Sequence, residues 1–180
     1  MPIKLTELKK ELKSYDQKEL ISLISELYKL NPEVKNYLSA KFQGEEAVEV
    51  LFEEARKKIK NVFFPDRGFG KLSLTTAKKA ISDFKRQTGD EDKTADLMIY
   101  YVELGTEFTA MYGDIDGAFY SSMASTFAQA VEIIDTSHER VASYEDRFQS
   151  ILEEAAQVGW GYPDVLNEIY SDMEFRPEDE

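Results

Sequence analysis

Residues 62–87 read VFFPDRGFGKLSLTTAKKAISDFKRQ, and this stretch decides how the rest of the chain is interpreted. An aromatic segment leads through a glycine-containing loop into a basic, amphipathic segment. Residues 56–86 contain ten Lys or Arg residues and two acidic residues, although the formal net charge of the whole chain is −13. A positive block in an acidic protein attracts negative charge, which can come from the same chain or from a partner.

The segment that follows the loop has the periodicity of an amphipathic helix. Leu74, Ala77, Ile81 and Phe84 recur at spacings of three and four residues, which places them on one side of a helix. The basic residues fall on a separate side: Lys71, Lys78, Lys79, Lys85 and Arg86. We predict that Ser73 caps this helix and that Gly89 ends it.

The same spacing predicts helices along the rest of the chain. In the first part of the chain we expect a helix near 5–13, one from Asp16, one from Pro32 and one over 44–64. In the second part we expect helices over 90–113, from Asp116 to about His138, from a cap near Ser143 or Asp146 to Gly159, and a short one after Pro163. No segment shows the alternation of a strand. The sequence therefore predicts an all-α fold of eight or nine helices, stacked as antiparallel hairpins without a sheet.

A chain of 180 residues is long enough for one domain with a hydrophobic core. Its aromatic content of 12% is typical of folded proteins, because disordered chains contain few aromatic residues. We predict a single helical domain over residues 1–173 that folds without a cofactor, with a possible subdivision near 62–73. The segment 174–180 reads as an acidic tail.

Composition excludes several classes of function. The absence of cysteine rules out disulfides, thiolate metal sites and a cysteine nucleophile. The first residues lack the apolar region of a signal peptide, and the longest apolar run has six residues where a membrane helix needs about 20. We therefore expect a cytoplasmic protein with no membrane association, and the net charge disfavours general binding of nucleic acid.

Three stretches carry a family resemblance. They are LTELKKEL over residues 5–12, ELYKLNPEVK over 26–35, and the lysine-rich segment over 71–85. Together they resemble a family of small bacterial proteins that is known as a domain of unknown function. The resemblance implies a bacterial cytosolic protein with no assigned activity, and it transfers no catalytic residues.

The basic block has two interpretations. In the first, the helix over 90–113 neutralises it, because Asp92, Asp96, Glu103 and Glu107 share one flank of that helix. Each exposed ion pair would contribute about 0–1 kcal/mol. A solvated charged face of this kind is common on surface helices.

In the second interpretation, the block binds an anion at the start of its helix. Free N–H groups and basic side chains at a helix N-terminus suit a phosphate or a carboxylate. The candidate residues are Arg67, Gly68, Gly70, Lys71, Ser73, Lys78, Lys79, Lys85 and Arg86. The loop is not a P-loop, because Pro65 stands where that motif needs glycine and Leu72 where it needs Ser or Thr.

Metal and catalytic sites are disfavoured. His138 is the only histidine, and we expect it to pack at the C-terminal end of its helix rather than bind metal with Asp135. Glu103 and Glu107 read as a solvated helix flank. Asp114 begins a stretch that lacks the glycine and glutamate of a calcium loop, so we predict a turn with Asp116 as a cap.

Five aromatic residues lie at predicted loops: Phe63, Phe64, Phe69, Trp160 and Tyr162. They either plug the ends of the helical bundle or form a partner surface beside the basic helix.

These features favour a non-enzymatic interaction module that binds an acidic protein segment or a second copy of the chain. Binding of RNA or another phosphate-bearing ligand through the same face is the alternative. An enzyme is the third choice, because one histidine and no cysteine leave few groups for chemistry.

Overall fold

The computed structural model describes residues 2–177, and this part of the chain is built from helices without any strand. The nine helices are α1 (Leu5–Leu12), α2 (Gln17–Leu30), α3 (Pro32–Gln43), α4 (Glu45–Phe63), α5 (Leu74–Thr88), α6 (Glu91–Tyr112), α7 (Gly117–Ile134), α8 (His138–Ala155) and α9 (Tyr162–Ser171). The predicted all-α class is confirmed. Within residues 2–177 no helix combines the length and apolar character that crossing a bilayer requires.

Side-chain caps fix several helix starts where the sequence predicts them. At α2 the Glu19 N–H donates to Asp16 over 2.8 Å, and the Asp16 N–H donates back to the Glu19 carboxylate over the same distance. Asp90 and Asp116 accept in the same way from the first turns of α6 and α7. Each bond satisfies an N–H that the first helical turn leaves without a partner.

The boundary between α7 and α8 differs from the prediction. The chain leaves the helix after Ile134, and the Ser137 hydroxyl accepts from the Arg140 N–H to start α8 at His138. His138 therefore belongs to α8 and not to the end of α7. Because α8 already begins at His138, the predicted cap near Ser143 or Asp146 is wrong.

Two compact units make up the chain, residues 1–48 and residues 49–180. The boundary falls at the start of α4, and residues 62–73, where we expected a possible subdivision, lie inside the second unit. Of the expected acidic tail, residues 174 and 175 donate backbone hydrogen bonds to Asp135, and residues 178–180 lie outside the described residues.

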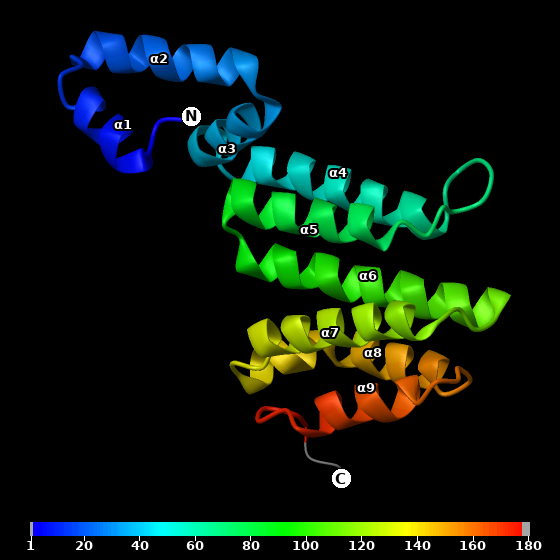
Figure 1. The fold of residues 1–180 in the computed structure, drawn as a ribbon. Helices are drawn as coiled ribbons and strands as arrows, with labels where there is room; N and C mark the ends of the chain where they lie inside the picture. The colour runs from blue at the N-terminus through cyan, green and yellow to red at the C-terminus, as the bar shows by residue number, and fades with distance from the viewer. Residues whose placement is uncertain (1, 178–180) are drawn as a thin grey trace. The chain divides into compact units, whose positions relative to one another are not determined.

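The second unit has a continuous core. Figure 1 shows α4, α5, α6 and α7 one below another, with consecutive helices running antiparallel. α8 packs against α6, and α9 packs against α7 and α8. The core is deepest between α6 and α7, where Tyr101, Met123 and Phe127 are fully buried. Gly105 allows this close approach, because a Cβ at that position would lie 2.3 Å from the Met123 sulfur. Burial raises the pKa of Tyr101 to about 12, although its hydrogen bond with Ser122 opposes the shift.

The first unit has no such core. Its helices α1, α2 and α3 contain no buried residue. The apolar side that we expected α3 to bury is largely open, with Tyr37 at 45% exposure and Phe42 at 78%. Periodicity predicts which side of a helix is apolar, and here nothing within the unit covers that side.

Candidate partner-binding face

Residues 64–73 form a loop that folds back on the end of α4. The Leu72 N–H donates to the Val62 carbonyl over 3.1 Å. Gly70 passes so close to the helix that a Cβ there would lie 2.3 Å from the Phe63 carbonyl oxygen, so only glycine fits. The loop is therefore held against α4, whereas Phe69 points away from it and is 91% exposed.

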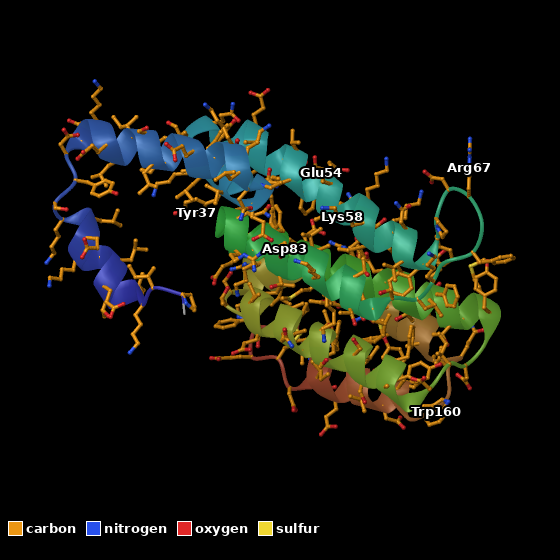
Figure 2. The ribbon with its side chains drawn as sticks, turned by 45° about the horizontal axis from the view of Figure 1, so that its top comes forward. Tyr37, Glu54, Lys58, Arg67, Asp83 and Trp160 are labelled. Atoms are coloured by element: carbon orange, nitrogen blue, oxygen red, sulfur yellow. The ribbon has the colours of Figure 1, made fainter. Side chains whose placement is uncertain are left out.

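The loop closes one end of a hollow of about 380 Å³ between α4 and α5. Lys58 lines the hollow from α4, and Arg67 and Lys71 line its edge from the loop. The rest of the lining is Asn61, Val62, Pro65, Phe69, Ser73 and Thr76. Figure 2 shows Arg67 at the loop, away from the stacked helices. The hollow thus combines positive charge with an apolar floor.

A second hollow, of about 350 Å³, lies where α5 meets α6 and α7. Lys78 and Lys85 line it from α5. Its other lining residues are Ile81, Ser82, Met98, Thr126 and Gln129. The two hollows flank α5, and we call their five basic residues the basic face: Lys58, Arg67, Lys71, Lys78 and Lys85.

The basic residues of the block differ in their partners. Lys79 and Arg86 both bind Asp83, at 2.8 and 2.7 Å, and Lys60 binds Asp66 at 3.1 Å. Across residues 2–177, in contrast, none of the basic face makes an ion pair. The predicted binding set therefore divides: Lys79 and Arg86 share the one carboxylate of Asp83, whereas the basic face has no ion-pair partner among the described residues.

The acidic flank of α6 does not neutralise α5, so this prediction is wrong. Arg147 of α8 donates to Glu103 over 2.6 and 2.8 Å and to Asp96 over 2.7 Å. Burial lowers the pKa of Arg147, but the hydrogen bonds and charges of Glu103 and Asp96 more than offset this and leave it above its ordinary value. Arg140 of α8 likewise binds Asp92.

Charge is therefore segregated within the second unit. Outside the block, residues 49–180 contain 25 acidic residues and four basic ones. Three of those four, Lys93, Arg140 and Arg147, bind carboxylates, and Arg176 lies over the Tyr170 ring. Burial, with Glu107 and Glu103 nearby, raises the pKa of Glu154 on α8. Positive charge therefore concentrates on the C-terminal half of α4, the 64–73 loop and α5, and negative charge on α6 to α9.

The five aromatic residues at the predicted loops divide between the two alternatives. Phe63 and Tyr162 are 1% and 2% exposed, so they belong to the core, in line with the first alternative. The Tyr162 hydroxyl forms a hydrogen bond with Thr106, and burial raises its pKa. Phe64 is half-buried against Phe108, with ring centroids 5.7 Å apart.

Phe69 and Trp160 are the exposed members of the set. Trp160 lies in the turn between α8 and α9, is 63% exposed and packs over Gly117. Figure 1 shows this turn and the 64–73 loop at the same end of the second unit. Met111 and Tyr112 end α6 there with exposures of 62% and 60%. Helical spacing places Met111 on the apolar stripe of α6, but the structure leaves it exposed at this end of the unit.

The backbone amides at the start of α5 are largely used within the loop. The Leu74 N–H donates to the Leu72 carbonyl, and the Thr76 and Ala77 N–H groups donate to the Ser73 carbonyl. The Ser73 hydroxyl bonds to the Thr76 hydroxyl over 2.7 Å and does not cap the helix. An anion at this loop would therefore be held by basic side chains and not by the amide cradle that we expected.

His138 has a structural environment. Its Nδ1 lies 3.2 Å from the Phe175 carbonyl oxygen, and its ring meets the Phe175 ring edge-on. In the described part of the chain, no group of three or more His, Asp or Glu residues is arranged to hold a metal ion.

Sequence reasoning found the basic residues of α5 and the loop, but it missed Lys58, Met98 and Gln129. These residues come from α4, α6 and α7 and join the hollows only through packing. Lys58 had a signal, since it belongs to the basic block, whereas a single Met or Gln on a helix has none.

No curated protein and no solved structure matches this chain. A family model described as a family of unknown function, DUF6155, matches residues 3–174, so the chain belongs to this family.

Proposed function

We propose that this chain is a non-enzymatic interaction module that binds an acidic protein segment on the basic face. The observation that carries the proposal is that Lys58, Arg67, Lys71, Lys78 and Lys85 line two hollows without an ion pair in residues 2–177. In contrast, the four basic residues of the second unit that lie outside the block either bind carboxylates or, in the case of Arg176, lie over an aromatic ring. The face therefore keeps a charge that a partner can complement.

The lining of the hollows supports a peptide as the ligand. Val62, Pro65 and Phe69 line one hollow, and Ile81 and Met98 line the other. Concave surfaces that are mainly apolar, with a few charged groups, accept side chains and orient them. An acidic segment with interspersed apolar residues satisfies both features.

Binding of RNA through the same face is the second candidate. It is favoured by Phe69, which is 91% exposed between Arg67 and Lys71 and could stack on a base. The rest of the second unit opposes it, because 25 acidic residues outside the block repel a polyanion that extends beyond the face. A short acidic segment avoids most of this repulsion.

The test measures binding of two fluorescent probes to the full chain by anisotropy. One is a peptide of glutamate with interspersed leucine and phenylalanine, and the other is a single-stranded RNA of equal charge. We expect the peptide to bind more tightly than the RNA, and we expect its affinity to fall as the salt concentration rises. The triple variant Lys71→Glu, Lys78→Glu and Lys85→Glu should lower the affinity for the peptide at least about 10-fold, or about 1.4 kcal/mol.

The matched control reverses Lys9, Lys13 and Lys18 to Glu in the first unit. It changes the net charge by the same amount in the other unit, so peptide binding should stay within about twofold of the unmodified chain if the basic face is the site. Equal losses in both variants, or no peptide binding, would reject the proposal. Tighter binding of the RNA would favour the second candidate.

A further inference from the structure

The first unit exposes an apolar surface that its own helices do not cover. Among the described residues, eleven of the seventeen large hydrophobic side chains that are exposed lie in residues 2–48. They include Ile24 at 48%, Leu27 at 43%, Tyr28 at 40% and Phe42 at 78%. Apolar exposure on this scale marks an interface in soluble proteins.

The geometry of the unit explains why it has no core. α2 and α3 pack together as a hairpin joined at Asn31. Two helices form a single layer, and a core needs a second layer to close over it. The amphipathic pattern of both helices therefore calls for an apolar surface from elsewhere.

We propose that the second layer comes from another copy of this chain. Two α2–α3 hairpins, placed with their apolar sides together, form an antiparallel four-helix bundle, a common way for helical hairpins to bury such surfaces. The proposal is independent of the basic face, which lies in the other unit.

Charge favours a second copy as the occupant. Residues 1–48 contain eight lysines and eight acidic residues, so the unit is neutral in a chain of net charge −13. Two copies can meet here without the repulsion that the acidic helices would impose elsewhere. A strongly charged partner would gain little from a neutral surface.

Shape also favours self-pairing. Ile24, Tyr28, Leu38 and Phe42 line a hollow of about 440 Å³ between α2 and α3, while Phe42 itself projects with 78% exposure. A two-fold interface uses the same patch twice, so it requires both a recess and a projecting group on one surface. Here each copy can insert an aromatic ring into the hollow of the other.

The surface is modest in size. A stable interface uses about 800 Å² and 20–30 residues from each partner. α2 and α3 contain 14 and 12 residues, and only one side of each helix can face a partner. We therefore expect a weak dimer that forms as the protein concentration rises.

The test is sedimentation equilibrium of the full chain across protein concentration. We expect a species of twice the 20.7 kDa chain mass at high concentration. Tyr28→Glu combined with Phe42→Glu should weaken dimerisation at least about 30-fold, because it places two charges in the apolar contact. Phe69→Glu is the control: it adds one of these two charges at an exposed aromatic residue of the second unit, and it should leave the dimer intact.

A second measurement does not depend on the folding of the double variant. The chain has no cysteine, so Ser25→Cys and Ser39→Cys each introduce one thiol at the hollow, and Ser121→Cys introduces one on α7. A flexible bis-maleimide should join two copies through residue 25 or 39 and not through 121. A chain that stays monomeric at all concentrations, or a dimer that only Phe69→Glu dissociates, would overturn the proposal.

Discussion

Gly70 controls the position of the loop that bears Arg67 and Phe69. We predict that Gly70→Ala lowers the free energy of unfolding by about 1–3 kcal/mol, the usual cost of forcing an atom into a packed site. The added Cβ would meet the Phe63 and Val62 carbonyl oxygens at 2.3 and 2.5 Å, so the loop has to move away from α4. Urea unfolding measures the loss, and faster trypsin cleavage after Arg67 reports the released loop.

Phe69→Ala is the control for this prediction. The side chain is 91% exposed, so its removal should change stability by less than about 0.5 kcal/mol. If Gly70→Ala is equally mild and Arg67 stays resistant to trypsin, the close approach of the loop to α4 is not what holds it in place.

At the scale of helices, Arg147 joins α8 to the acidic flank of α6. We predict that Arg147→Met costs about 2 kcal/mol of stability, because it removes charge-assisted hydrogen bonds and leaves Asp96 and Glu103 without their cation. Its side chain is 29% exposed, so solvent screens the loss only in part. Thermal and urea unfolding at neutral pH measure the effect.

Arg140→Met is the comparison within the same helix. Its partner Asp92 is 77% exposed, and an exposed pair contributes about 0–1 kcal/mol. We therefore expect a smaller loss from Arg140→Met, and added salt should reduce that loss proportionately more, because exposed ion pairs are screened more than partly buried ones. Equal losses would show that the contacts of Arg147 with two carboxylates contribute no more than one exposed pair.

These helices show what could be predicted from sequence. Asp16, Asp90 and Asp116 cap helices where predicted, because a cap depends on residues only three positions apart. The partner of the α6 flank could not be predicted in this way. The nearest basic helix in the chain is α5, but α8 supplies Arg140 and Arg147, and helical periodicity does not say which neighbour covers which flank.

The predicted boundary of α7 at His138 was wrong for a related reason. Its spacing from Ile134 continues the apolar stripe of α7, so periodicity extended that helix by one turn. The break depends on Asp135, which leaves the helical conformation and accepts from the Glu174 and Phe175 N–H groups. A contact between residues 40 positions apart leaves no local signal.

At the scale of the whole molecule, the sequence predicts amphipathic helices in both units but does not show that only one unit has a core. Leu20, Leu23 and Leu27 of α2 have the same spacing as the buried residues of α4. Spacing records which side of a helix is apolar. Whether a second layer covers that side depends on the arrangement of all the helices, or on another chain.

The two units should therefore differ in local stability, which hydrogen–deuterium exchange of the full chain measures directly. At about 1 μM protein, we expect the amides of α2 and α3 to exchange far faster than those of α6 and α7, because few buried contacts oppose local opening in the first unit. Raising the concentration should slow exchange in α2 and α3 only, because binding to a second copy stabilises the bound state by mass action. Protection in α2 and α3 equal to that in α6, already at the lowest concentration, would show that these helices are covered within the monomer.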